Sequence, residues 1–129
     1  MSATENFQIS QIGQIAIDVQ ELDRAVAFYR DVLGLPLLFQ VPPGLAFFQC
    51  GTVRLMMEQP QGNQMVTRAT SIIYYQVDDL DATYAAMRAK GVQLIDTPHL
   101  VAQMADHELW MFFCYDSEEN TVAFMHEKR

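Results

Sequence analysis

The chain has 129 residues, of which 50% are hydrophobic, and 16 acidic against 8 basic side chains give a net charge of −8. This length suits a single domain, and no apolar run approaches the roughly 20 residues that span a bilayer. The acidic balance argues against a nucleic-acid surface and against an anionic membrane. The first residues, MSATENFQIS, lack a basic region and a long apolar stretch, so no signal peptide is expected and a cytoplasmic location is predicted.

The first half opens with a strand that leads into an amphipathic helix. Within Ile12–Val19 the apolar residues alternate with polar or small ones, the two-residue period of a strand with one apolar face. Over Leu22–Leu33 the apolar residues recur at helical spacing, and Gly34 suits the position after a helix, where a positive φ is common. A strand and a helix that packs on its apolar face are therefore expected.

The same pattern recurs 58 residues later, which predicts two βαβββ units, about 12–58 and 70–126, within one domain. In the first unit, strands are expected over Pro36–Val41, Ala46–Cys50 and Val53–Glu58. The second unit is expected to contain a strand over Ile72–Val77, a helix over Leu80–Lys90, and strands near Val92–Asp96 and over Glu108–Tyr115 and Thr121–His126. The polar stretch Gln59–Arg68 is expected to join the units, and Thr97–Asp106 to form an irregular loop.

The strings LDRAVAFYRDVLGL, VRL, and YDSEEN followed by TVAFM resemble the vicinal oxygen chelate superfamily. This superfamily includes glyoxalase I, ring-cleaving dioxygenases, methylmalonyl-CoA epimerase and the bleomycin-resistance proteins. The resemblance covers residues 12–126 and implies an α+β fold, in which two βαβββ units form a curled, cup-shaped sheet with the helices outside. Because these proteins share a scaffold and differ at the site, the resemblance implies a fold rather than one activity.

Metal-using members of the superfamily place their ligands at four strand positions that face the cup. Carried onto this sequence, these positions are Gln14, Arg54, Ile72 and Ala123. A glutamine can serve as a ligand, whereas an arginine cannot, and the other two side chains have no donor atom. Glu58 lies on the same strand face as Arg54, but two protein ligands are fewer than a catalytic zinc site uses. No metal or other cofactor is therefore expected, and Glu58 is interpreted first as a solvated strand end.

Arg54 lies on an otherwise apolar strand face and is the main candidate for ligand binding. Its guanidinium can bind a carboxylate or phosphate through two parallel hydrogen bonds. An internal ion pair with Asp18 or Glu58 is the equally weighted alternative. Tyr74 and Trp110 are candidates for the walls of the cup, with ordinary core packing as the alternative for each.

Two histidines bracket the segment that breaks the repeat. His99 and His107 can act as a base or as hydrogen-bond donors toward a ligand carbonyl if they turn into the cup. Exposed loop histidines with no role are the alternative. Because the segment Thr97–His107 is irregular within a repeated pattern, it is expected to border the cup and to be mobile.

The sequence therefore predicts two alternative functions. The first is a metal-free protein, similar to the bleomycin-resistance branch, that binds a small organic ligand in an apolar cup, with Arg54 and His107 as polar anchors. The alternative is a lyase, epimerase or dioxygenase that uses Gln14, Glu58 and His107 around a divalent metal. No catalytic residue is assigned. A homodimer is expected, because a curled sheet leaves strand edges and apolar surface for a second copy to cover.

Overall fold

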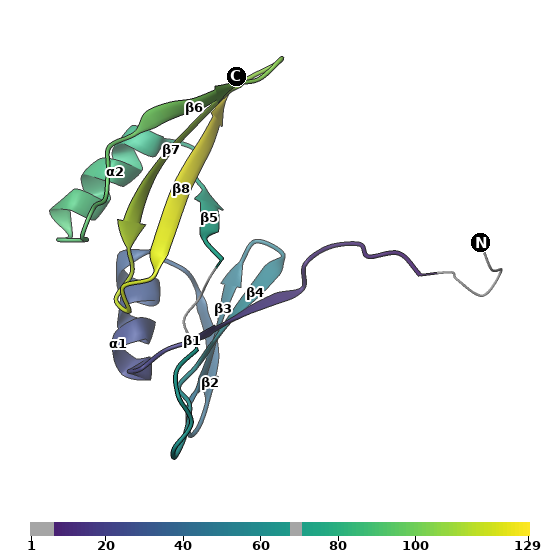
Figure 1. The fold of residues 1–129 in the computed structure, drawn as a ribbon, viewed down its shortest axis with the longest axis vertical. Helices are drawn as coiled ribbons and strands as arrows, with labels where there is room; N and C mark the ends of the chain where they lie inside the picture. The colour runs from purple at the N-terminus through teal and green to yellow at the C-terminus, as the bar shows by residue number, and fades with distance from the viewer. Residues whose placement is uncertain (1–6, 68–70) are drawn as a thin grey trace.

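The structure is a computed structural model that describes residues 7–67 and 71–129. It contains two four-stranded mixed sheets, each with one helical segment, and confirms the predicted α+β class (Figure 1). The elements are β1 (Gln14–Asp18), α1 (Leu22–Ala27) with its π-helical continuation η1 (Phe28–Val32), β2 (Leu37–Val41), β3 (Leu45–Cys50), β4 (Val53–Glu58), β5 (Ile73–Gln76), α2 (Leu80–Ala89), β6 (His99–Gln103), β7 (Glu108–Tyr115) and β8 (Thr121–Lys128). None of the helices in this described part is long and apolar enough to cross a membrane.

The two units have the same topology, as the internal repeat predicts. The strand order is β1-β4-β3-β2 in the first sheet and β5-β8-β7-β6 in the second. In each sheet the first and last strands of the unit pair in parallel, and the other pairs are antiparallel. A parallel pair needs a long crossover connection, and the helix supplies part of it in each unit. The boundary between the expected linker and the second unit falls at residues 68–70, which lie outside the described residues.

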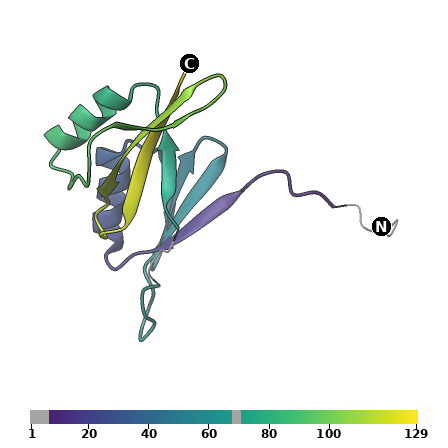
Figure 2. The same cartoon turned by 45° about the horizontal axis from the view of Figure 1, so that its top comes forward.

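Each helix covers one face of its sheet and leaves the other face uncovered. Under α1 and η1 the core contains Tyr29, Phe48 and Met57, all almost completely buried. Under α2 it contains Phe112 and Cys114, and α2 begins where the Asp79 carboxylate accepts a hydrogen bond from the backbone N–H of Ala82. Both helices lie on the same side of the molecule (Figures 1 and 2). The uncovered side of each sheet is called its open face below.

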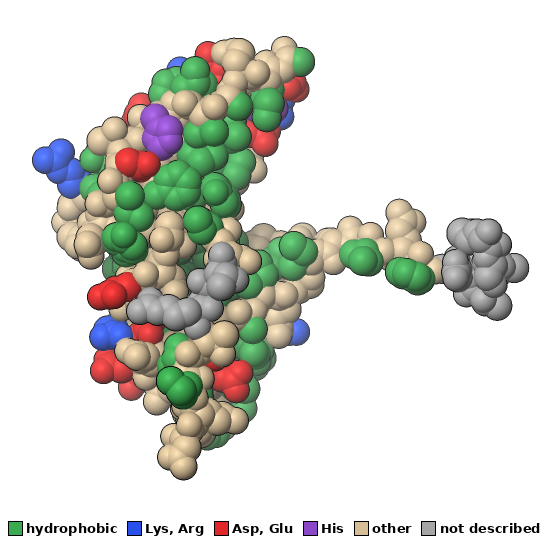
Figure 3. All heavy atoms as spheres, in the orientation of Figure 1, with side chains coloured by type: hydrophobic (Ala, Val, Ile, Leu, Met, Phe, Trp, Pro, Cys, Tyr) green, Lys and Arg blue, Asp and Glu red, His purple; other side chains and the backbone are tan. Residues whose placement is uncertain are grey.

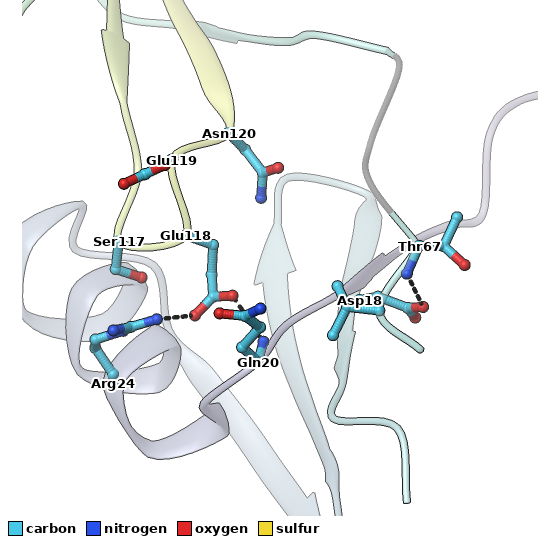
Figure 4. Close-up of a pocket in the computed structure, with 9 residues that line it drawn as sticks. Asp18, Gln20, Arg24, Thr67, Ser117, Glu118, Glu119 and Asn120 are labelled. Carbon is cyan, nitrogen blue, oxygen red and sulfur yellow. Dashed lines mark hydrogen bonds and ion pairs between the residues drawn. The ribbon is translucent and has the colours of Figure 1, made fainter. Parts of the chain in front are cut away.

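The units are joined where α1 meets the turn between β7 and β8. The Tyr29 hydroxyl donates a 2.7 Å hydrogen bond to the carboxylate of Asp116, and both residues are buried. The Arg24 guanidinium forms a 2.7 Å ion pair with Glu118, and the two side chains point toward one another in Figure 4. These contacts fix the second unit against the helix of the first.

The position of one strand differs from the prediction. A strand was expected near Val92–Asp96, but that stretch forms only an isolated bridge from Leu94 to Cys114. The Asp96 side chain then accepts the hydrogen bond of the Phe113 backbone N–H, so no further backbone pair forms there. The strand β6 begins instead at His99, within the segment that was expected to be an irregular loop.

Candidate functional site

A row of four side chains crosses the open face of the first sheet. It consists of Gln14 on β1, Arg54 on β4, Phe47 on β3 and Phe39 on β2, and is called the Arg54 row below. Arg54 Nε donates a 2.7 Å hydrogen bond to Gln14 Oε1, and its guanidinium carbon lies 5.6 Å from the centre of the Phe47 ring. The Phe47 and Phe39 rings stack with their centres 4.7 Å apart. The row therefore places a cation directly beside two stacked aromatic rings.

The strand registers bring these residues to one face. Gln14 pairs with Arg54, and Phe39 pairs with Phe47. Between β3 and β4 the partners are Gln49 with Arg54 and Phe47 with Met56, so Phe47 is a diagonal neighbour of Arg54 on the same face. Diagonal neighbours on an antiparallel pair lie within reach of long and aromatic side chains. The contact between the guanidinium and the ring follows from this pairing.

The structure bears on one of the two interpretations of Arg54, the internal ion pair. Within residues 7–67 and 71–129, no carboxylate lies within 4.0 Å of its guanidinium. Asp18 instead accepts a 2.9 Å hydrogen bond from the backbone N–H of Thr67. Glu58 lies exposed at the far end of β4, four residues or about 13 Å along the strand. The internal ion pair is therefore not formed, and Gln14 is the polar partner.

The pairing also corrects one of the four positions at which the superfamily holds its metal. Ala16 pairs with Met56 in the first sheet, and Tyr74 pairs with Ala123 in the second. Ala16 and Tyr74 are related by the 58-residue repeat, so the counterpart of Ala123 is Met56. Arg54 lies two residues before it on the same face.

The four positions are therefore Gln14, Met56, Ile72 and Ala123, and they do not fit the divalent ion that the superfamily implies. They offer an amide, a thioether and two hydrocarbon side chains, and a thioether is a weak acceptor. Gln14 Nε2 contacts the Met56 sulfur at 3.8 Å. Gln14 and Glu58 lie at opposite ends of the β1–β4 pair and cannot share one ion. Among the described residues, no group of three or more His, Cys, Asp or Glu side chains is placed to hold a metal.

A second aromatic group lies on the open face of the second sheet. The rings of Tyr74 and Phe113 meet edge to face at 5.9 Å, and His99 stacks on Phe113 at 6.4 Å. Ala123 lies between Tyr74 and Phe113 in the register and is fully buried, so its small side chain allows these two rings to meet above it. His99 Nδ1 lies 2.8 Å from the backbone oxygen of Thr97. The structure thus places the predicted Tyr74 and His99 together, on the second sheet.

His107 lies apart from both groups, at the turn between β6 and β7. Its Nδ1 lies 2.7 Å from the Asp106 carboxylate, and its Nε2 lies 3.8 Å from Glu127. Hydrogen bonds from His107 and then from Arg129 lower the pKa of Asp106. The segment Thr97–His107 contains the edge strand β6 and the turn that leads to β7.

Trp110 lies on the face of β7 that α2 covers. It pairs with His126, and its indole N–H donates a 3.0 Å hydrogen bond to Glu108. Its position alternates with those of Met111 and Phe113, whose side chains lie on the open face. Trp110 lines a hollow of about 290 Å³ beside the first turn of α2 instead of the surface that carries Arg54.

Phe39, Phe47 and Phe113 are site candidates that sequence reasoning missed. The run Ala46–Cys50 was predicted as a strand, but no face was assigned to its residues. The two-residue turn Gly51-Thr52 fixes the pairing of Cys50 with Val53, and counting back from it places Phe47 beside Arg54. That turn was a sufficient signal for Phe47. Phe39 pairs with Phe47 in regular register with Val41 and Leu45, so the turn at residues 42–44 sets its contact, and the register shift affects only Leu37.

A polar hollow of about 260 Å³ lies at the junction of the units (Figure 4). Its lining includes Gln20, Arg24, Thr67 and Glu118. Both Glu118 oxygens are already used, because one accepts from the backbone N–H of Gln20 and the other pairs with Arg24. We interpret this hollow as part of the contact between the units.

Two βαβββ units with open sheet faces define a glyoxalase-like fold. The model of the Glyoxalase/Bleomycin resistance protein/Dioxygenase superfamily matches residues 11–124, and the chain belongs to this superfamily. It is 26% identical to the Bacillus subtilis protein YraH over 98 residues. This aligned stretch covers 67% of this chain and 77% of YraH.

Solved structures show the same fold. Lactoylglutathione lyase from Agrobacterium tumefaciens has a TM-score of 0.73 and 24% identity, over 92% of this chain and 94% of the lyase. A putative glyoxalase family protein from Bacillus anthracis has a TM-score of 0.75 and 18% identity, over 95% of this chain and 99% of that protein. At these identities the likeness shows the fold alone.

Proposed function

We propose that the protein binds a small organic molecule on the open face of the first sheet. Arg54 is the polar anchor, and the stacked rings of Phe47 and Phe39 form the apolar floor. The main support for this proposal is the environment of Arg54. Its side chain is exposed, is oriented by Gln14 and has no carboxylate partner in the described part of the chain. A cation held in place beside aromatic rings provides both specificity and apolar contact for a small ligand.

The proposed binding uses no divalent metal. The four positions related to the superfamily's metal site carry an amide, a thioether and hydrocarbon, and Glu58 lies about 13 Å away from Gln14 along the strands. A metal-dependent lyase, epimerase or dioxygenase would need donors at these positions. For this reason we favour ligand binding over the enzymatic alternative.

We also propose that the protein works as a homodimer. Val41 at the edge of the first sheet, Tyr74 on β5 and Ile72 just before it are exposed apolar residues outside the Arg54 row. The N-terminal segment 7–13 extends away from the body and exposes further apolar side chains (Figure 1). Hydrophobic side chains also gather over the second sheet in Figure 3. A second copy would remove this surface from water. Sedimentation of a clean monomer near 14.7 kDa would contradict this proposal.

Native mass spectrometry after incubation with cell extract tests the proposed function. The wild-type protein is expected to retain a small-molecule adduct after treatment with EDTA, and the Arg54→Gln variant is expected to lose it. Arg88→Gln on the exposed side of α2 is the matched control and should keep the adduct. An adduct that disappears on chelation but persists in Arg54→Gln would favour the metal-dependent alternative.

A further inference from the structure

We infer that the ligand is a planar organic anion, a carboxylate attached to an aromatic or heteroaromatic ring. The inference rests on the proposed function and specifies the class of ligand. The inference is based on the Arg54 row, which places an amide, a guanidinium and two stacked rings across adjacent strands.

The guanidinium has a defined edge available for an anion. Its Nε donates to Gln14, which fixes the plane of the group. No residue of the described part accepts a hydrogen bond from the two terminal nitrogens of Arg54. These two nitrogens form a fork that matches the two oxygens of a carboxylate. The fork is planar, as a carboxylate is, so both hydrogen bonds can form in one plane.

The aromatic part of the ligand has its own surface. The Phe47 ring lies 5.6 Å from the guanidinium carbon, and the Phe39 ring stacks 4.7 Å beyond it. Phe39 is 49% exposed, so a flat ring can pack against it. Aromatic rings attract one another in offset or edge-to-face arrangements. A ring bonded directly to the carboxylate therefore lies over the phenylalanines when the anion is on Arg54.

The net charge of −8 does not prevent anion binding at this position. The acidic residues of the same face, Asp18 and Glu58, lie opposite each other in the strand register at the far end of β1 and β4. They lie about 13 Å from Arg54, beyond the screening length of about 8 Å at physiological salt. The guanidinium contacts the anion directly, so the local attraction exceeds the screened repulsion.

Calorimetric titration with three probes tests the inference. The probes are 2-naphthoate, the neutral 2-naphthalenemethanol, and cyclohexanecarboxylate, which is an anion without a flat ring. The wild-type protein should bind 2-naphthoate about tenfold or more tightly than either other probe. Arg54→Gln should remove that advantage, Arg54→Lys should retain part of it, and Phe39→Leu should weaken both naphthalene probes. Arg88→Gln should leave all three affinities unchanged.

The outcomes separate this inference from the proposed function. If the neutral probe binds as tightly as 2-naphthoate, and Phe39→Leu but not Arg54→Gln weakens both, the open face binds ligands and the anionic class is wrong. If Arg54→Gln and Phe39→Leu both leave 2-naphthoate binding unchanged, the ligand lies elsewhere and the proposed function falls too. Absence of 2-naphthoate binding overturns the inference, whereas the adduct from cell extract tests the proposed function separately.

Discussion

The hydroxyl of Tyr29 donates a 2.7 Å hydrogen bond to the carboxylate of Asp116, joining the helix of the first unit to the β7–β8 turn of the second. The same carboxylate accepts hydrogen bonds from the backbone N–H groups of Glu118 and Asn120, each at 2.8 Å. The Tyr75 hydroxyl is also buried nearby, but it has no hydrogen-bond partner of normal geometry among the described residues. Two buried tyrosine hydroxyls at one junction thus differ in hydrogen bonding.

We predict that Tyr29→Phe and Tyr75→Phe have different effects on stability. Tyr29→Phe removes a donor from a buried carboxylate and should lower the free energy of unfolding by about 2 kcal/mol. Tyr75→Phe removes a buried hydroxyl without a hydrogen-bond partner among the described residues, and should change the free energy of unfolding by less than about 0.5 kcal/mol or raise it. Urea denaturation of the two variants measures the difference. Equal losses in both would show that the hydroxyl of Tyr75 is also hydrogen bonded.

We predict that the protein loses stability at alkaline pH. Burial raises the pKa of Tyr29 and of Tyr75 above the usual value of 10. Below pH 10 both residues are protonated in the folded and unfolded states, so this stabilisation is fully present. Above pH 10 the unfolded chain releases protons that the folded chain keeps, so the free energy of unfolding falls by about 1.4 kcal/mol per pH unit for each tyrosine.

Urea midpoints at pH 8, 10 and 11 measure this loss of stability. Burial also raises the pKa of Cys114 to about 11, so this thiol adds to the loss from pH 9 upward. Tyr75→Phe should reduce the slope above pH 10, because one of the two tyrosines is removed. Constant midpoints up to pH 11 would contradict the burial of these hydroxyls.

We predict that Arg24 stabilises the contact between the units. The Glu118 side chain is only 5% exposed and forms a 2.7 Å ion pair with Arg24. Arg24→Met should leave that carboxylate without its cation and lower the free energy of unfolding. Arg30→Met is the matched control on the same helical segment, because Arg30 pairs with its exposed neighbour Asp31 and its removal should lower the free energy of unfolding less. Equal effects of the two substitutions in urea denaturation would refute the role of Arg24.

We predict no stoichiometric binding of zinc, nickel, manganese or iron(II) at the positions related to the superfamily's metal site. Their side chains, from Gln14, Met56, Ile72 and Ala123, provide one amide oxygen and a weak thioether donor. The nearby Arg54 guanidinium also repels a divalent cation. Calorimetry with each metal measures this. Stoichiometric binding that disappears in Gln14→Ala would contradict the account and favour the enzymatic alternative.

The sequence was sufficient to predict the fold because two signals repeat within it. The alternation in β1 and β5 and the helical spacing after each, 58 residues apart, predicted two βαβββ units, and the pairing confirms them. The strand β6 was missed because His99–Gln103 lacks alternation, and its pairing with β7 contains a register shift. Such a strand depends on its partner rather than on its own pattern.

The site was predicted only in part, for a related reason. Strand alternation placed Gln14, Arg54 and Tyr74 on uncovered faces, where the structure has them. Trp110 was a candidate for the wall of the cup, with core packing as the alternative, and its position in β7 places it on the covered face. The aromatic floor was not predicted, because Phe39 and Phe47 meet through pairing between strands. Contacts of this kind depend on register, which alternation within one strand does not specify.

The central claim is that a small organic anion binds on the open face beside Arg54, and side-chain NMR during titration with 2-naphthoate tests it most directly. The Arg54 Nε–H and the Gln14 amide report on the open face, and the indole N–H of Trp110, the one tryptophan in the chain, reports on the covered face. The account predicts saturable shifts of the Arg54 and Gln14 signals and an unchanged Trp110 signal. Shifts at Trp110 with unchanged Arg54 and Gln14 signals would contradict it.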